Sequence, residues 1–439
     1  MSADDLKVLE SAGKFMKTRP RCSVKAFTIP EWAKRRRRPI FWPDLNKYIG
    51  RDVLLQGYIP LRHDIRRKVN DSAWSVQFDF ASWYDQLPLH EKISTFFSVN
   101  GSTCLASLPM GFRPSAEVAH IITEAIADFP LPDGVNVVVY IDNIRFGGPN
   151  KEGVEKAARE FLQRADVVGA VLNERDTTPK RKEDFLGERF DLVKKTRRLT
   201  GKTIEKVKAA ASALEAPMSF RQVAAIFGLL FFCSEVLQLS LARVFKALRY
   251  YREQMSRVTD WDDTAQRPSA EALLEIRAWI TKANRNTAVP IFECDESFPE
   301  LTIFCDASAQ GWGAVCISSS GVHQAGAPWT ADEVARHDVG HSTIAEPLAV
   351  RHAVHAFVST RCSKVKIRSD HQGLVFAGNA GYGKSEAYNT MCVTLEESFP
   401  NTRFVFEFIP GALNTLADEI SRRWEKTQPV PVSKSLKDG

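Results

Sequence analysis

The stretch VNVVVYIDNIRFGG (135–148) decides the fold that we expect for this chain of 439 residues. Two arms rich in β-branched and aromatic residues flank the dipeptide Asp142-Asn143. Such arms around such a dipeptide are typical of a β-hairpin with a short turn. The sequence therefore predicts a hairpin that presents Asp142 in its turn.

The segments around this hairpin alternate between strand and helix patterns. Residues 74–80 (WSVQFDF) predict a strand that ends near Asp79. Residues 116–129 place apolar side chains at helical spacing, and a second amphipathic helix is expected from about 151 to 168. Strand, helix, hairpin and helix in this order indicate an α/β sandwich with the helices on one face of the sheet.

Asp79 and Asp142 would meet if the strands that carry them pair with each other. Phosphoryl transfer to a primer end uses two divalent metals about 4 Å apart, and Mg²⁺ prefers carboxylate oxygens. Two carboxylates on adjacent strands are a rigid way to supply such ligands. An aspartate at a strand end can also serve turn formation alone, so the spacing by itself leaves both interpretations open.

In the second half of the chain the sequence pattern changes first to helices and then back to strands. Residues 203–252 are helical in pattern and basic, and 262–286 is another helix candidate. From 301 the pattern returns to strands, in LTIFCDAS, AVCISS, KVKIRSD and TRFVFEFIP, with helices expected at 344–358 and 415–425. We expect the clearest domain boundary near residues 290–300.

Four acids stand at the ends or starts of these later elements. Asp306 and Asp370 each end a predicted strand, Glu346 starts a helix, and Asp418 lies on the last helix. Carboxylates gathered in one cleft repel each other unless metal ions neutralise them. The four acids therefore favour a two-metal nuclease over a purely structural network.

Five motifs of the first half resemble the palm of reverse transcriptases. They are FDFASWYDQLPL (78–89), LPMGFRPSAEVAH (108–120), VYIDNIRFGG (139–148), GAVLNERDT (169–177) and FLGERFDL (185–192), and they stand in the order found in that family. The resemblance implies that Asp79 and Asp142 bind the metals. It also implies that Tyr84 lies under the nucleotide sugar and selects deoxynucleotides, while Gly111 opens the helix that supports the template base pair.

The upstream segment AFTIPEWAKRRRRPIFWPDLN (26–46) resembles the fingers hairpin that grips the incoming triphosphate. Arg37 stands nearest to the triphosphate-binding arginine of the family, with Arg36 and Arg38 as alternatives. A guanidinium there would neutralise phosphate charge. The same basic run could instead act as a nuclear import signal.

Three residues depart from the palm pattern of the family. Asn143 replaces the second aspartate of the hairpin, Met110 stands where many relatives carry glutamine, and Glu31 stands where lysine is common. These departures leave room for a palm that has lost its polymerase activity.

The C-terminal part resembles the RNase H domain of retroelements over residues 300–424. The strings DASAQGWGA (306–314) and PGALNTLADEISR (410–422) carry this resemblance. It implies that Asp306, Glu346, Asp370 and Asp418 bind the catalytic metals. Ala412 departs from the pattern, because some RNase H enzymes carry a histidine in that loop. We expect His341 and His371 to be local hydrogen-bonding residues.

The middle of the chain, residues 218–253, is similar to the thumb and connection of retrotransposon polymerases, especially the DIRS-like, tyrosine-recombinase class. We therefore expect a multidomain α/β (α+β) protein with right-hand polymerase fingers and palm, a helical thumb and an RNase H-like domain. The expected domains are 1–70 (fingers and basic N-terminal segment), 71–200 (palm), 201–295 (thumb and connection), 296–425 (RNase H) and 426–439 (tail).

Composition agrees with a nucleic-acid enzyme inside the cell. Ten Lys or Arg residues lie between Lys14 and Arg38, against one acid, and a second basic cluster spans 180–208; such clusters suit a polyanion. The eight cysteines form no CxxC pair, so we expect reduced thiols. The N-terminus is not typical of a signal peptide and no long apolar run occurs. We expect a protein of the cytoplasm, the nucleus or both, without a membrane partner.

The function implied is an RNA-directed DNA polymerase with RNase H activity. It would use two Mg²⁺ (or Mn²⁺) ions per active site and act on an RNA template, a DNA primer, deoxynucleoside triphosphates and the RNA–DNA hybrid. One alternative is a hybrid-binding protein with an inactive palm, which Asn143 would favour. Another is an RNase H nuclease whose palm only holds the substrate.

Overall fold

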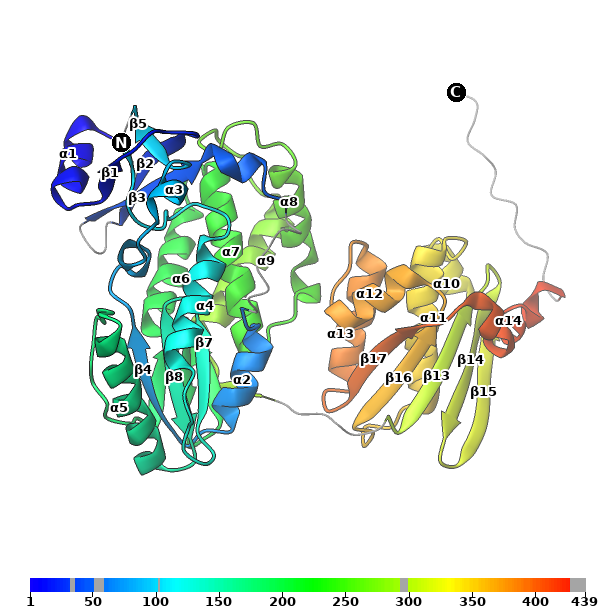
Figure 1. The fold of residues 1–439 in the computed structure, drawn as a ribbon. Coiled ribbons are helices and arrows are strands. Elements are labelled where there is room, and N and C mark those ends of the chain that lie inside the picture. The colour runs from blue at the N-terminus through cyan, green and yellow to red at the C-terminus, as the bar shows by residue number, and fades with distance from the viewer. Residues whose placement is uncertain (32–35, 51–58, 102, 293–298, 427–439) are drawn as a thin grey trace, which may run out of the picture. The chain divides into compact units, whose positions relative to one another are not determined.

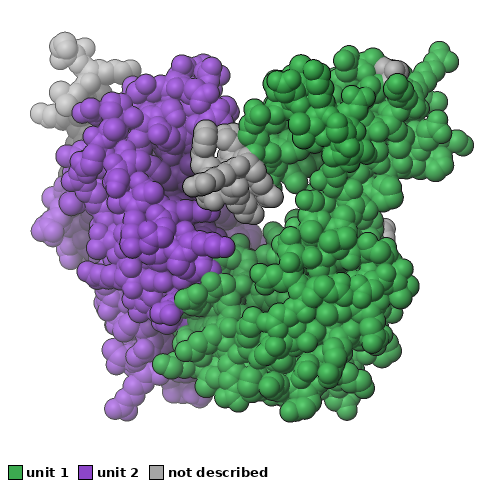
Figure 2. Space-filling model, turned by 90° about the vertical axis from the view of Figure 1, so that its left-hand side faces the viewer, with its two compact units in different colours: residues 1–197, 290–293 green, residues 198–289, 294–439 purple. Residues whose placement is uncertain are grey.

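The computed structural model describes residues 1–31, 36–50, 59–101, 103–292 and 299–426 (Figure 1). The chain divides into two compact units, residues 1–197 with 290–293 and residues 198–289 with 294–439 (Figure 2). The second unit contains both the expected thumb and the expected RNase H segment. The expected boundary at 295/296 and the tail beyond residue 426 lie outside the described residues.

A three-stranded antiparallel sheet forms the centre of the first unit. Its order is β4 (Trp74–Asp79), β8 (Asn143–Gly148) and β7 (Asn136–Tyr140). Helices α4 (Ser115–Ala127) and α5 (Lys151–Val167) pack on one face around buried Phe78, Phe146 and Phe161 (Figure 1). The predicted order of strand, helix, hairpin and helix is confirmed.

The sequence did not predict the helix on the other face of this sheet. Val138 alternates with its neighbours along β7 and packs against Ile65 and Val69 of α2 (Arg62–Asn70). The expectation of helices on a single face was therefore incomplete.

The turn of the hairpin differs from the predicted one. Tyr140 pairs with Asn143, so the two turn residues are Ile141 and Asp142 rather than Asp142 and Asn143. Asn143 is instead the first residue of β8. Ile141 has a φ of 60°, a left-handed conformation that is rare for a β-branched side chain. The residue preferences of turns favour Asp142-Asn143, so they could not predict a turn formed by Ile141 and Asp142.

Before residue 106, the described residues outside α2 and β4 form small sheets and short helices. The strands β2 (Val24–Glu31) and β3 (Arg36–Pro43) make the expected antiparallel hairpin. The remaining elements are α1 (Ala3–Ser11), β1 (Phe15–Lys17), η2 (Asp44–Lys47), η3 (Trp83–Gln86), α3 (Glu91–Ser94), β5 (Ser98–Asn100) and β6 (Thr103–Leu105), with the sheet order β1-β6-β5.

A second sheet, in the order β12-β11-β10-β9, follows α5 in the chain. Its strands are β9 (Lys182–Phe185), β10 (Glu188–Asp191), β11 (Thr196–Leu199) and β12 (Val289–Pro290). The two units divide within β11.

Helices make up the first part of the second unit. They are α6 (Gly201–Ala213), α7 (Phe220–Leu237), η4 (Ala242–Val244), α8 (Phe245–Met255) and α9 (Ala270–Arg285) around one apolar core. The helix expected from residue 262 starts at 270, because Ser269 caps it by accepting from the Ala272 N–H. By length and mean hydropathy (1.6) α7 could cross a membrane, but core helices meet the same criteria and half of α7 is buried.

The C-terminal part of the second unit has a five-stranded mixed sheet in the order β15-β14-β13-β16-β17 (Figure 1). The strands are β13 (Leu301–Ala307), β14 (Gly311–Ser318), β15 (Gly321–Pro328), β16 (Lys364–Ser369) and β17 (Arg403–Phe408). The helices are α10 (Ala331–Arg336), α11 (Ser342–Phe357), α12 (Gln372–Ala380), α13 (Glu386–Ser398) and α14 (Thr415–Ser421), with η5 (Gly411–Leu413) and η6 (Arg423–Lys426). The edge strand β15 was missed because much of it is exposed and lacks an apolar pattern.

A buried ion cluster joins α2 to the second sheet of the first unit. Glu188 on β10 accepts two hydrogen bonds of 3.0 Å from the guanidinium of Arg66 and one of 2.9 Å from Arg62. Arg197 lies 3.6 Å from the same carboxylate. Glu188, Arg66 and Arg197 are all buried. Loss of one partner would leave uncompensated charge in the interior.

We expect Glu188→Ala to lower the free energy of unfolding by about 3–5 kcal/mol, the range for one removed partner of a buried ion pair. Urea denaturation measures this loss. Asp184→Ala on the neighbouring β9 is the matched control, because Asp184 pairs with Arg189 at the surface and such pairs contribute about 0–1 kcal/mol. Equal losses for both variants would contradict the role of the buried cluster.

Candidate active sites

The paired strands of the first unit bring Asp79 and Asp142 together. Asp79 ends β4 and pairs in register with Asn143, the residue after Asp142. The Phe80 N–H donates to the Asp142 carbonyl at 3.2 Å. Burial and then the negative charge of Asp79 raise the pKa of Asp142. The two carboxylates therefore lie close enough to repel each other, as the sequence predicted.

Each of these carboxylates accepts a hydrogen bond from a neutral amide. Asn173 Nδ2 donates to Asp79 Oδ2 at 2.7 Å, and Asn143 Nδ2 donates to Asp142 Oδ1 at 2.9 Å. The two carboxylates repel each other, and hydrogen bonds hold one oxygen of each in place. Such oxygens are suitable ligands for a hard divalent cation such as Mg²⁺. Asn173 was not singled out from the sequence, although it lies within the quoted motif GAVLNERDT.

Tyr84 lies beside these carboxylates. It follows β4 in the short helix η3. Burial, followed by the charge of Asp142, raises the pKa of the Tyr84 hydroxyl, while the charge of Arg38 lowers it. The side chains of Tyr84, Asp142 and Arg38 therefore lie near one another.

Arg37 and Arg38 have different partners. Arg38 Nη1 lies 3.9 Å from Met110 Sδ, and its charge lowers the pKa of Asp142. Arg37 Nη2 instead pairs with Asp5 Oδ1 at 2.7 Å. Successive side chains of a strand point to opposite faces, so only one of the two can face the carboxylates. That residue is Arg38, the alternative, rather than Arg37, which the sequence had favoured.

Gly111 lets the segment before α4 approach the β2–β3 hairpin. Its φ is 115°, and a Cβ there would lie 2.7 Å from the Phe41 carbonyl oxygen. Asn46 Nδ2 donates to the Gly111 carbonyl at 2.8 Å, and Asn46 Oδ1 accepts from the Arg113 N–H at 2.9 Å. A larger residue at position 111 would both strain the backbone and push β3 away.

In the second unit, three acids come together at one edge of the five-stranded sheet. Because β13 and β16 run parallel, Asp306 and Asp370 lie at the same edge. Glu346, in the first part of α11, completes the group. One carboxylate oxygen from each residue lies within 4.8 Å of the others. This acidic triad of Asp306, Glu346 and Asp370 could hold a metal ion.

The electrostatics of the acidic triad also fit a divalent cation. Burial, with the charges of Asp306 and Asp370, raises the pKa of Glu346 to about 9. Burial is also the main cause that raises the pKa of Asp306 to about 6. Among the described residues, buried Glu346 Oε2 has no hydrogen-bond partner. A hard cation would satisfy this oxygen and remove the repulsion.

Asp418 lies near the acidic triad but outside that group. Its charge contributes to the raised pKa of Asp306, while its Oδ1 pairs with Arg422 Nε at 2.7 Å. Ser421, one turn later, donates from Oγ to Asp306 Oδ2 at 2.6 Å. The structure thus brings together three of the four predicted acids and adds Ser421, which the sequence did not single out.

A glycine places α14 against the sheet at this point. Gly313 is the register partner of Asp306. A Cβ on Gly313 would collide with the Ala417 carbonyl and the Ser421 N–H of α14. Glycine is therefore needed at position 313, because it lets α14, which carries Asp418 and Ser421, lie directly on β14.

The loop before α14 also approaches an acid closely. A Cβ on Gly411 would lie 2.8 Å from Asp370 Oδ2. His371, next to Asp370, accepts from the Leu374 N–H at 3.1 Å and caps α12, which is the local role that we expected. His341 lies 3.5 Å from Asp338.

The raised pKa of Glu346 predicts a pH-dependent stability of the metal-free protein. The folded state holds a proton on Glu346 that the unfolded state releases from its ordinary pKa of 4.5 upward. The stabilisation is therefore present below pH 4.5 and is lost as the pH rises toward 9. Unfolding by urea in EDTA at several pH values should show this decline, and Glu346→Gln should flatten it. The surface variant Glu205→Gln is the control, and an unchanged slope in Glu346→Gln would contradict the assignment.

Solved structures resemble the fold of this chain, whereas comparisons of its sequence find no match. No protein-family model and no curated protein matches it. A solved structure of the foamy viral protease-reverse transcriptase in complex with RNA/DNA hybrid matches with a TM-score of 0.51 and 14% identity. The match covers 99% of this chain but only 54% of that chain.

Two further structures of the foamy viral protein were found. The dRH form in complex with double-stranded DNA has a TM-score of 0.49 at 15% identity and covers 91% of this chain and 68% of its own. Another complex with double-stranded DNA has a TM-score of 0.49 at 14% identity, with coverages of 92% and 81%. At such identities the likeness concerns the fold alone, and this chain has a reverse-transcriptase-like fold.

Proposed function

We propose that this chain is an RNA-directed DNA polymerase of a retroelement that also cleaves the RNA strand of the RNA–DNA hybrid. The observation that supports this most is the presence of two separate groups of carboxylates, each at one edge of a sheet. Asp79 and Asp142 form one group in the first unit, and the acidic triad forms the other in the second unit. The motifs of the middle segment favour a DIRS-like, tyrosine-recombinase element.

In the first group, Asp79 and Asp142 would hold the metals. Mg²⁺ or Mn²⁺ bound there would lower the pKa of the primer hydroxyl and neutralise the phosphates. Asn173 and Asn143 fix one oxygen of each carboxylate, which limits the rotation of the two ligands. Asn143 brings no charge, so the site has one carboxylate fewer than the family pattern.

The substrate would be bound by residues around these carboxylates. Arg38 is placed to attract the triphosphate, since its charge already acts on Asp142. Tyr84 would lie under the sugar and select deoxynucleotides. Gly111 and Asn46 fix the start of α4, on which the template base pair would rest.

In the second group, Asp306, Glu346 and Asp370 would hold the metals that activate water for RNA cleavage. Glu346 must lose its proton when a cation binds, because its pKa is raised to about 9 in the empty site. Ser421 holds one oxygen of Asp306. Asp418 would join the site as a fourth ligand if it exchanged its partner Arg422 for a metal.

A second candidate function is an RNase H nuclease whose polymerase palm only binds the hybrid. The uncharged Asn143 beside Asp142 is the observation that favours it. The two proposals share the nuclease site and differ only in DNA synthesis.

Separation of the two activities by mutation tests the proposal. Asp142→Ala should lower DNA synthesis by more than about 100-fold, beyond the loss caused by outer-shell residues of metal sites, and should spare RNA cleavage. Asp306→Asn should do the reverse. Primer extension on a labelled RNA template measures both products.

The surface variant Asp166→Ala, which removes an exposed ion pair with Arg175, is the control and should retain both activities. Loss of both activities in either active-site variant would contradict two independent sites. DNA synthesis that survives Asp142→Ala would remove that residue from the polymerase site.

A further inference from the structure

The turn that presents Asp142 contains the strained residue Ile141, with a φ of 60°. In a two-residue hairpin the N–H of the first turn residue takes no part in the strand ladder. This N–H therefore needs a partner outside the ladder, and a protein group that bonds it would also hold the turn. The partner is a side chain from α4.

His120 of α4 supplies this hydrogen bond. Its side chain is fully buried, and its Nδ1 accepts from the Ile141 N–H at 3.3 Å. A ring nitrogen can accept only when it carries no proton. The proton of the neutral ring therefore sits on Nε2, which faces Glu124 Oε1 at 3.5 Å. The chain of contacts runs from Glu124 through His120 to the backbone next to Asp142.

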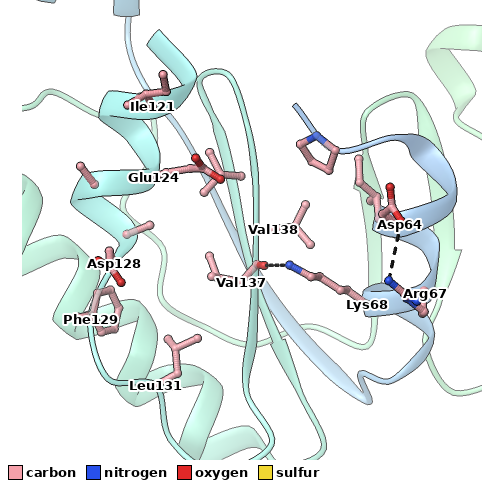
Figure 3. A pocket seen from close by; sticks show the side chains of 15 residues that line it. Asp64, Arg67, Lys68, Ile121, Glu124, Asp128, Phe129, Leu131, Val137 and Val138 are labelled. Atoms are coloured by element: carbon pink, nitrogen blue, oxygen red, sulfur yellow. Dashed lines mark hydrogen bonds and ion pairs between the residues drawn. The ribbon is translucent and has the colours of Figure 1, made fainter. Parts of the chain in front are cut away.

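Glu124 is half exposed and lines a pocket of about 790 Å³ between α2 and α4 (Figure 3). The figure shows this carboxylate on α4 on the side toward the hairpin strand that contains Val137 and Val138. The Glu124 carboxylate thus attracts the Nε2–H of His120 from the solvent side. This attraction favours the ring orientation in which Nδ1 points to the turn.

We infer that His120 is a positioning residue for Asp142 in DNA synthesis, an inference that rests on the proposed polymerase function. The turn residue Ile141 is directly bonded to Asp142, so a displaced turn moves the carboxylate. Displacement of a metal ligand lowers turnover more than substrate binding. Neither the strand pattern nor the motifs assign this role to His120.

If His120 only filled space in the core, its variants would behave differently than if its hydrogen bond to Ile141 mattered. Asn places an acceptor at the δ position but is smaller than His, whereas Leu fills the space and has no acceptor. Gln places its polar atoms at the ε position, toward Glu124. The order of activity among these three variants therefore separates packing from hydrogen bonding.

The test compares His120→Asn, His120→Leu and His120→Gln in primer extension. We expect His120→Leu and His120→Gln to lower kcat for nucleotide incorporation about 10–100-fold, as other outer-shell partners of metal ligands do. The KM for the nucleotide should change less than about twofold, because only the ligand position is affected. His120→Asn should retain activity within a few-fold of the parent.

Two controls accompany these variants. RNA cleavage by the same chains should be unchanged, which shows that the second unit is intact, and a cooperative urea unfolding transition like that of the parent should show that the first unit is folded. Thr123→Val on the same helix removes a buried hydroxyl that donates to the Ala119 carbonyl one turn earlier, and it should leave kcat unaffected. Higher activity in His120→Leu than in His120→Asn would overturn the inference in favour of packing.

A parent protein that makes no DNA would refute the proposed polymerase function but would still allow a test of His120. Mn²⁺ binding to the first unit can be measured in a background of Asp306→Asn and Glu346→Gln, which disables the acidic triad. Weaker Mn²⁺ binding in His120→Leu than in His120→Asn would support the inference. Equal affinities in both variants, or tighter binding in His120→Leu, would overturn it.

Discussion

Repulsion between buried or half-buried carboxylates is the interaction on which both candidate sites depend. Burial and the charge of Asp79 raise the pKa of Asp142, and burial with the charges of Asp306 and Asp370 raises the pKa of Glu346 to about 9. Carboxylates that repel each other would move apart unless the strands that carry them were paired. The pairing of β4 with β8 prevents this in the first unit, and the pairing of the parallel strands β13 and β16 prevents it in the second. A bound divalent cation would neutralise this repulsion.

Close backbone approach makes these arrangements possible. Gly111 lets the segment before α4 contact β3, Gly313 lets α14 lie on β14, and Gly411 brings a loop to Asp370. At each point a Cβ would meet another backbone or carboxylate atom. Neutral donors then fix the acids: Asn173 on Asp79, Asn143 on Asp142 and Ser421 on Asp306. In this way uncharged groups hold one oxygen of each of these three acids in place.

The sequence predicted the acids and the elements that carry them, because a carboxylate at a strand end leaves a local pattern. It did not predict Asn173 or Ser421, since their partners are 94 and 115 residues away in the chain. The sequence favoured Arg37, but the structure places Arg38 near Asp142 and pairs Arg37 with Asp5, because a shift of one residue in a strand moves a side chain to the other face. The turn was also misplaced by one residue, since the strained Ile141 follows from strand register rather than from turn propensity.

The central claim is that one chain contains a polymerase site and a nuclease site. Primer extension by the parent protein on a labelled RNA template, with Mg²⁺ or Mn²⁺, tests it most directly when DNA product and RNA fragments are scored in the same tube. We predict that both products form and that EDTA abolishes both. RNA fragments without DNA product would contradict the polymerase claim and favour a nuclease with a hybrid-binding palm.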